Sequence, residues 1–559
     1  MAGPDEFDRL WASWSASVAA GARDSRRAAA IGLAVVVGYV LMLVVPGRLV
    51  VFDMPMDALI PLDAVWRMHY GQRPHFDFLT PVGDLYYAVH RVASWITGAG
   101  DPAVLPMTNA IVGLPFFALA WLATRDRLPE PLRTITATTI ALASMSPRTL
   151  DDEGMVSFNA MYNRWGWELA FVGLALVLVE PQTERRRREA WEGALLVGVM
   201  LGLFWLKVTY LALLCAGLGI AVVCAPANRR LAVVGGAAGL LAVGLSALTP
   251  TGAAYLVDLR LTAATAADGG GLLRSALIVP TLVVNRTNIL VLIGLAFAMS
   301  RAARGDHGAA VGRAALAVMG LLAFSVVVAS QNNDRTIPVL ALGAMIPVVA
   351  VSRWPGGHRG LPILAMIPAI LMLLPAWTDS RTAWTFLSTT EHRGYTSNAD
   401  SALAGMRVPT MRTPDVPKDG GMVARVLDGT MDGSTFGMLN KVSWNIDSPI
   451  IVDDGVAMIE RHGLQQSKIA SLTFSPVFPY YFGTEPPRGL LAWMDFGRTF
   501  GKRWDERACD ALADTDVVMQ PKVWLIEGMA EEHETCLKAE FELVEEDRLW
   551  KMWKRSGAH

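Results

Sequence analysis

Residues 51–87 have the sequence VFDMPMDALIPLDAVWRMHYGQRPHFDFLTPVGDLYY and directly follow the first long apolar run of the chain. We therefore predict that this stretch leaves the membrane and lies along its outer face. Ionisable groups are dense here, because two arginines and two histidines stand among five aspartates: Asp53, Asp57, Asp63, Asp77 and Asp84. Carboxylates held close to a bilayer are costly and usually have a task. The alternative is an interfacial amphipathic helix whose acids are solvated.

The order and spacing of residue types within this stretch are more informative than any single residue. After Asp57 come the pair Trp66-Arg67, Gly71, the turn at 74–78 and the segment 80–87, which ends in aromatic residues. This series resembles the first extracytoplasmic loop of membrane-embedded glycosyltransferases of the C-type fold (GT-C), which use polyprenyl-phosphate-linked sugars. The resemblance implies an inverting sugar transfer in which Asp57 is the base. Ala58 stands where that family often has Glu, so Asp53 stays in contention.

The composition is that of a polytopic membrane protein. Of the 559 residues, 53% are hydrophobic, and the mean hydropathy is +0.36, which is too apolar for a soluble chain of this length. The net charge of −2 and the lack of a basic domain give no indication of a nucleic-acid partner. Four cysteines without a CxxC pair predict neither a disulfide framework nor a zinc site. The first 27 residues are polar, so no cleavable signal peptide is expected.

Arginine-rich loops set the predicted topology. The run at 184–188, ERRRR, is the strongest mark of a cytoplasmic loop, and every other proposed inner loop is short and carries Arg. Residues 1–27 are predicted to form a cytoplasmic interfacial segment. Residues 28–377 are predicted to form a polytopic α-helical, GT-C-like membrane domain with about eleven spans, and its catalytic first outer loop is 52–102. The N-terminus is then cytoplasmic and the C-terminus lies outside.

Two details of this membrane domain depend on local sequence. Residues 190–225 are apolar except for Lys207 and are too long for one helix, so two helices are expected to meet near Lys207 at the outer face. The first spanning helix is predicted over 28–51. Residues 250–275 are Gly-rich and contain Asp258, and we predict an outer loop there.

From residue 378 to residue 559 the polarity becomes mixed, and no stretch is long enough to span a membrane. The patterns predict helices at 422–429 and 450–463, strands at 468–475 and 516–521, and a closing strand pair that begins at Cys536. Helices that alternate with short strands indicate an extracytoplasmic α/β domain. No Walker loop is found and no Gly-x-Gly-x-x-Gly follows a predicted strand, which favours a cap or acceptor-binding module over a nucleotide enzyme.

Sugar transfer from a lipid phosphate needs a base that deprotonates the acceptor hydroxyl. Asp57 is the first candidate by its spacing, and Asp53 is the second. Four further residues are candidates for the acceptor side or for support of the base: Asp77, Arg67, Asp151 and Asp152. For Asp77 the alternative is a turn-forming role before an aromatic residue. The acidic cluster Asp151-Asp152-Glu153, in the second predicted outer loop, either binds a cation together with Asp57 or is simply solvated, so the need for a divalent metal stays open.

The departing phosphate needs positive charge at the outer ends of the spans, because phosphate prefers Arg or Lys in a partly dry site. The candidates for this role are Lys207, Arg335 and Arg164. As alternatives, Lys207 reaches the lipid headgroups with its long side chain, and Arg335 pairs with a nearby carboxylate.

These features predict a glycosyltransferase of the bacterial inner membrane that moves a sugar from a polyprenyl-phosphate donor to a glycan or lipid acceptor at the outer face, in cell-envelope assembly. The sequence specifies neither the sugar nor the acceptor. The alternatives are a lipid-linked polysaccharide polymerase or ligase, and a non-catalytic envelope-assembly protein. A transporter is disfavoured, because the apolar runs are nearly free of interior charge and the two halves are not alike.

Cys509 and Cys536 are the only cysteines of the predicted outer domain. In the periplasm both thiols would face an oxidising compartment, which favours a disulfide between them. Such a bond needs Cα atoms within about 7 Å of each other. By closing a loop of roughly 27 residues it would stabilise the domain by about 3–4 kcal/mol. The alternative is two unrelated buried thiols.

Overall fold

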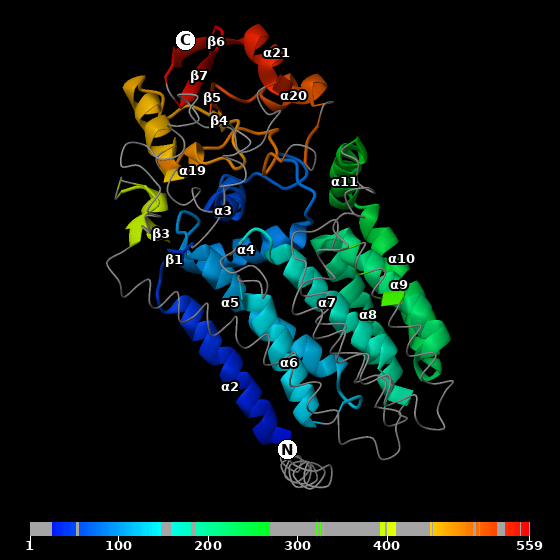
Figure 1. Ribbon diagram of the computed structural model, residues 1–559. Coiled ribbons are helices and arrows are strands. Elements are labelled where there is room, and N and C mark those ends of the chain that lie inside the picture. Colours follow the sequence, from blue (N-terminus) through cyan, green and yellow to red (C-terminus); the bar gives the residue numbers. More distant parts are fainter. Residues whose placement is uncertain are drawn as a thin grey trace, which may run out of the picture.

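The computed structural model stacks two regions: a bundle of helices, and a region of helices and strands that lies on one end of that bundle (Figure 1). The structure describes residues 25–51, 55–128, 130–146, 158–179, 181, 186–268, 320–321, 325, 328, 392–396, 398, 400–409, 448–449, 451–495, 499–501, 504–522, 531–547 and 549–557.

The bundle consists of long helices whose sequences are mostly apolar. They are α2 (Ser25–Val44), α5 (Val104–Ala123), α6 (Glu130–Met145), α7 (Met161–Leu178), α8 (Arg186–Leu206), α9 (Val208–Cys224) and α10 (Gly236–Ala247), with the short turns η1 (Pro226–Asn228) and η2 (Leu231–Gly235) before α10. In Figure 1 most of these helices run side by side. Among the described residues, three helical segments are long and apolar enough to cross a membrane, namely Arg27–Val44, Val104–Ala123 and Glu189–Leu206.

A bent pair of helices adds a fourth candidate span. Leu231–Ala247 and Pro250–Thr265 pass the same test together and meet at an angle of 90°. The apolar runs that sequence analysis places between 280 and 376 lie outside the described residues, apart from a few positions. The fold is therefore a helical one with three or four candidate membrane spans in its described part, and the count of eleven stays a prediction.

Two shorter helices lie between the bundle and the C-terminal region. They are α3 (Pro55–His69) and α4 (Asp84–Thr97), and both come from the first predicted outer loop. Helix α3 begins with Pro55, whose fixed φ suits the first helical position, and nearly all of its side chains are buried. It packs against α4, α5 and the short helix α19 (Phe478–Phe482). The segment that was predicted to organise the site is thus enclosed between the two regions (Figure 1).

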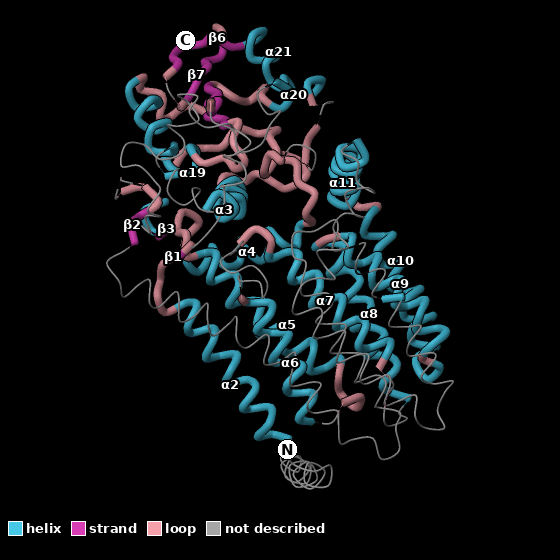
Figure 2. Tube along the Cα trace, in the orientation of Figure 1, coloured by secondary structure: helices cyan, strands magenta, loops and turns pink. Residues whose placement is uncertain are grey.

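The described strands lie outside the bundle and form two small sheets (Figure 2). The four-stranded sheet has the order β4-β5-β7-β6, from β4 (Ile469–Ser471), β5 (Val517–Pro521), β7 (Trp550–Arg555) and β6 (Phe541–Glu546). β4 and β5 are parallel, and the other two pairings are antiparallel. The three-stranded sheet joins β1 (Leu49–Val50) in parallel to β3 (Met406–Pro409), which pairs with β2 (His392–Gly394). Because β1 follows α2 directly, this sheet ties the first helix to the C-terminal part.

Several predicted elements are found at the expected residues. Helices α8 and α9 meet at Lys207, residues 451–461 are helical, and β4 and β5 fall within the predicted strands. The predicted helix at 422–429 lies outside the described residues. The predicted first helix, 28–51, ends early at Val44, because Pro46 cannot continue it and Gly47 turns the chain with φ +59°.

Two predictions of secondary structure were wrong. The supposed outer loop at 250–275 contains the helix α11 (Pro250–Asp268), which begins at a proline and is rich in alanine, the best helix former. The closing strand pair does not begin at Cys536. Residues 531–540 form the helix α21 (Glu531–Glu540), and only then do β6 and β7 follow.

Candidate functional site

Asp57, the first candidate base, lies in the first turn of α3 and is only 5% exposed. Its charge acts on the phenol of Tyr86, which lies on α4. Burial raises the pKa of Tyr86 well above its ordinary value, and neighbouring groups, the Asp57 charge among them, raise it further. The second candidate, Asp53, lies outside the described residues.

Lys207 occupies the break between α8 and α9, where the backbone is extended with φ −164° and ψ 115°. Its Nζ donates to Oδ1 of Asn163 at 2.9 Å and lies 4.5 Å from the ring centre of Tyr162. The Tyr162 ring in turn makes an edge contact with the Tyr86 ring, centre to centre 5.5 Å. The candidate phosphate cation therefore contacts Tyr162, the candidate base acts electrostatically on Tyr86, and these two rings contact each other.

Gly83 allows the first outer loop to pack directly on this break. Its backbone N–H donates to the carbonyl of Leu206 at 3.0 Å. A Cβ atom at this position would lie 2.2 Å from the carbonyl oxygen of Trp205, closer than any side chain tolerates. The glycine of the closing segment 80–87 thus brings α4, and with it Tyr86, against the end of α8.

A buried histidine links the first outer loop to α11. His75 has φ +66°, its Nδ1 lies 2.8 Å from Oδ2 of Asp258, and its Nε2 lies 3.4 Å from Oδ1 of Asp84. The backbone N–H of Thr80 donates to the same oxygen of Asp258 at 3.0 Å. Burial lowers the pKa of His75, but the hydrogen bonds and charges of the two aspartates outweigh it, so the net shift is upward.

Arg67 forms a buried ion pair within α3, and it also ties this helix to the C-terminal region. Its Nε donates to Oδ2 of Asp63 at 2.6 Å, and its Nη1 donates to the carbonyl of Pro487 at 2.7 Å. One residue earlier, Trp66 Nε1 donates to the carbonyl of Thr484 at 2.8 Å. The Trp-Arg pair of the motif thus holds the segment 484–487 over α3.

Asp77 closes a turn and also contacts the C-terminal region. Its Oδ2 accepts from the backbone N–H of Arg73 at 2.7 Å, which is the turn-forming role. Its Oδ1 accepts from Arg488 at 3.1 Å, and its carbonyl accepts from the N–H of Gly489 at 2.7 Å. A contact with the acceptor, the role suggested for Asp77, is not tested by these interactions.

Arg164 lies next to Asn163 in the first turn of α7 and is buried. Its guanidinium donates to the carbonyl of Ser146, just after the end of α6. The remaining candidates, Asp151, Asp152 and Arg335, lie outside the described residues. The structure therefore links Asp57 to Lys207 through two tyrosines in contact, and it adds three residues that sequence reasoning missed: Tyr86, Tyr162 and Asn163.

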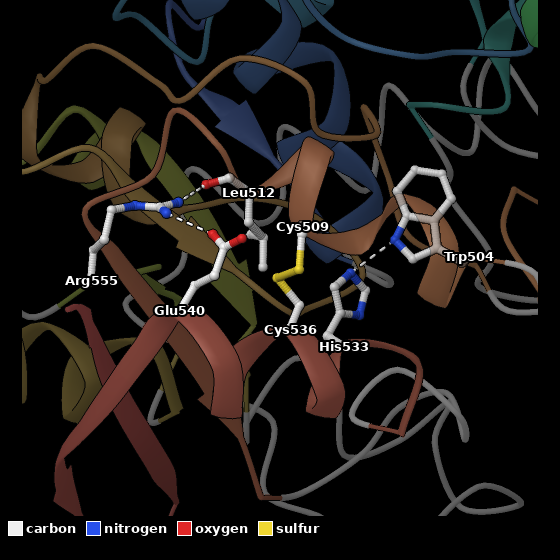
Figure 3. Close-up of a disulfide and its surroundings, with 7 residues drawn as sticks. All are labelled: Trp504, Cys509, Leu512, His533, Cys536, Glu540 and Arg555. Atoms are coloured by element: carbon white, nitrogen blue, oxygen red, sulfur yellow. Dashed lines mark hydrogen bonds and ion pairs between the residues drawn. A yellow bond between two sulfur atoms is a disulfide. The ribbon is translucent and has the colours of Figure 1, made fainter.

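A disulfide joins Cys509 and Cys536 in the C-terminal region, with their Cα atoms 5.3 Å apart. It connects α20 (Asp505–Ala511) to α21 (Figure 3). Beside it, Trp504 Nε1 donates to Nε2 of His533 at 3.0 Å. Among the described residues, the one cluster with metal-type ligands is Cys509, Cys536 and Glu540, and its two sulfurs are bonded to each other.

Three solved structures resemble this chain at low TM-scores. The first is the Archaeoglobus fulgidus oligosaccharyltransferase with Zn and sulfate, at a TM-score of 0.36 and 11% identity, where the match covers 87% of this chain and 68% of the other. The second is ArnT from Cupriavidus metallidurans bound to undecaprenyl phosphate, at a TM-score of 0.38 and 12% identity, with coverage of 95% and 98%. The third is the oligosaccharyltransferase AglB from Archaeoglobus fulgidus with an inhibitory peptide and a dolichol-phosphate, at a TM-score of 0.38 and 12% identity, with coverage of 94% and 74%.

These neighbours are GT-C glycosyltransferases, the class that residues 51–87 resemble. No protein-family profile and no curated protein sequence matches this chain. Because the TM-scores are low, the function proposed below rests on the residues of this chain.

Proposed function

We propose that this protein is an inverting glycosyltransferase that moves a sugar from a polyprenyl-phosphate donor to an acceptor hydroxyl at the outer face of the membrane. One observation carries the proposal. The charge of a buried carboxylate, Asp57, acts on Tyr86, a lysine at a helix break, Lys207, contacts Tyr162, and the two tyrosine rings contact each other. The residue order of the first outer loop, which resembles that of polyprenyl-phosphate-dependent enzymes, supports the same reading.

The two residues divide the chemistry between them. The acceptor oxygen forms a bond to the anomeric carbon on the face opposite the phosphate, while the bond from that carbon to the phosphate oxygen breaks and leaves its electron pair on the lipid phosphate. Asp57 takes the proton of the acceptor hydroxyl as general base. Lys207 offsets the negative charge that develops on the departing phosphate, which a cation does best in a partly dry site.

We further propose that the site and the C-terminal region face the periplasm of a bacterial inner membrane. The disulfide between Cys509 and Cys536 supports this orientation, because such bonds persist in oxidising compartments. The arginine run at 185–188 supports it independently. It lies at the start of α8, whose other end leads to Lys207, and such runs stay in the cytoplasm.

The decisive experiment is Asp57→Asn, assayed in membrane vesicles with a panel of undecaprenyl-phosphate-linked pentoses and hexoses. Loss of general-base help should lower turnover by on the order of 10²–10⁴-fold, while expression and thermal unfolding stay as in the wild type. Asp101→Asn is the matched control from the same loop, since Asp101 Oδ1 accepts from the backbone N–H of Ala103 in an exposed turn. Near-normal transfer by Asp57→Asn would exclude Asp57 as the base. If Asp53→Asn is then inactive, the base is Asp53.

A further inference from the structure

Asn163, near the start of α7, is 1% exposed and has an incomplete set of hydrogen bonds. Its Oδ1 accepts from Lys207 Nζ at 2.9 Å and from the Tyr210 hydroxyl at 3.2 Å. An ammonium group can only donate, so the amide oxygen must face Lys207 and the Nδ2 group must face away from it. Within the described part of the chain, Nδ2 has no hydrogen-bond partner.

A second buried donor follows on the same face of α7. Trp167 lies one helical turn after Asn163, is 3% exposed, and has no described hydrogen-bond partner for its Nε1. Its ring packs edge-on against Tyr210 at 5.0 Å, the residue that also contacts Asn163. A buried N–H normally has a hydrogen-bond partner, so two without a described partner on one face indicate an acceptor that the described residues do not supply.

The surrounding backbone favours an anion as that acceptor. Helix α7 starts at Met161 and α9 starts at Val208, and neither start is capped by a side chain. Because Lys207 precedes α9 and contacts Asn163, the two helix N-termini come close together. Each carries the partial positive charge of a helix N-terminus, which favours anions such as phosphate. The ammonium of Lys207 adds a full charge at the same place.

We propose that Lys207 Nζ, Asn163 Nδ2 and the N-termini of α7 and α9 form a binding site for a phosphate group, and that this site holds the phosphate of the lipid carrier. The identification of the ligand as a lipid phosphate rests on the proposed function. Tyr162 contacts both Lys207 and Tyr86, and the charge of Asp57 acts on Tyr86, so the phosphate site and the candidate base are linked through this pair of tyrosines. Asn163 is then a further substrate-binding residue of the transfer.

The variant Asn163→Asp tests this site with little change of shape. It keeps an oxygen for Lys207 and Tyr210 but replaces the unpaired donor by an oxygen that repels phosphate. With purified full-length protein and undecaprenyl phosphate, we expect Kd to rise at least about tenfold, as for the loss of a charge-assisted hydrogen bond. A Kd within about twofold of the wild type would overturn the site and leave a structural water as the partner of Nδ2.

Two further variants control for the added charge and for a failure to fold. Asn109 is also buried and also has an unpartnered Nδ2 among the described residues, so Asn109→Asp matches the change in charge away from the site and should leave Kd unchanged. An equal loss of affinity in Asn109→Asp would overturn the site. If Asn163→Asp does not fold, Asn163→Leu removes the donor without a charge and should weaken binding in the same direction.

The choice of probe separates the lipid phosphate from other ligands. Competition by inorganic phosphate that disappears in Asn163→Asp would show that the phosphate itself is recognised. Undecaprenol binding as tightly as undecaprenyl phosphate would overturn the proposal, because affinity would come from the chain alone. The phosphate site and the proposed function can fail independently. If binding depends on Asn163 but transfer does not depend on Asp57, the phosphate site stands and the proposed function fails. If transfer depends on Asp57 but Kd does not depend on Asn163, only the phosphate site is excluded.

Discussion

Two buried asparagines at opposite ends of α7 have similar surroundings but different hydrogen bonding. Asn228, in η1, is 3% exposed and its Oδ1 accepts from Arg127 at 3.2 Å. Asn163, at the other end, is 1% exposed and its Oδ1 accepts from Lys207 at 2.9 Å. In Asn228 the Nδ2 group is also used, since it lies 3.0 Å from the carbonyls of Val177 and Val179 at the end of α7. In Asn163 it has no partner among the described residues.

The difference separates a polar cluster that holds helices together from one that is built for a ligand. At the Asn228 end, Arg127 also donates to Glu192 at 2.8 Å, so the cluster joins α7, α8 and the turn after α5 through its own groups. Buried polar groups in native structures are normally paired in this way. At the Asn163 end the residues leave a donor beside a cation, which an external acceptor can complete.

The largest expected effect comes from breaking the inner cluster with Arg127→Met. This change removes the guanidinium that Arg127 presents to the buried Glu192 carboxylate, and removing one partner of a buried pair costs about 3–5 kcal/mol. We expect a marked fall of the thermal unfolding midpoint in detergent. The matched control is Arg230→Met, because Arg230 is 79% exposed in its pair with Glu189 and such surface pairs contribute little. Equal midpoints for the two variants would contradict the structural role of Arg127.

A smaller effect distinguishes the two asparagines directly. Asn228→Asp places a carboxylate oxygen against the carbonyls of Val177 and Val179, and the lost and repelled contacts should cost about 1–3 kcal/mol. Asn163→Asp should not destabilise the protein, because its new charge faces Lys207. The measurement is the thermal midpoint of each purified variant without ligand. Equal destabilisation by both would mean that the Asn163 cluster is also structural.

Features that depend on one continuous stretch of sequence were predictable. The break at Lys207 follows from an apolar run that is too long for one helix, and the structure has the break at that residue. The strands β4 and β5 follow from short buried runs between polar residues. The helix end at Val44 was also encoded locally, in Pro46 and Gly47, but the prediction gave more weight to hydropathy than to those two residues.

Features that depend on partners far apart in the sequence were not predictable. Asp258 made 250–275 look like a solvated loop, whereas its carboxylate is buried against His75, 183 residues earlier. The segment 484–487 is held on α3 through its backbone carbonyls. Every residue has such a carbonyl, so the sequence gives no sign of this contact. Asn163 was not among the predicted site residues, because only the tertiary structure shows that one side of its amide has no described partner.

The smallest predicted effect uses a third polar cluster, which lies at the outer end and in which a histidine is paired with carboxylates of the chain itself. Both ring nitrogens of His75 face carboxylates, Asp258 on α11 and Asp84 at the start of α4. If a cluster is structural because its charged groups pair with one another, and not because of where it lies, His75 should affect stability and not the binding of the donor. The pKa of His75 is raised above its ordinary value of 6.5, despite burial, by hydrogen bonds to the two aspartates.

The sign of the pH effect follows from this shift. A histidine whose pKa is higher in the folded state stabilises the fold fully below pH 6.5, and it loses that contribution as pH rises through the raised pKa. The thermal midpoint of the wild type should therefore fall across this window, and His75→Gln should flatten the fall. Undecaprenyl phosphate affinity at a fixed low pH should be the same in both proteins. A loss of affinity in His75→Gln comparable to that of Asn163→Asp would show that the outer end acts as one site, and that pairing within a cluster does not distinguish its role.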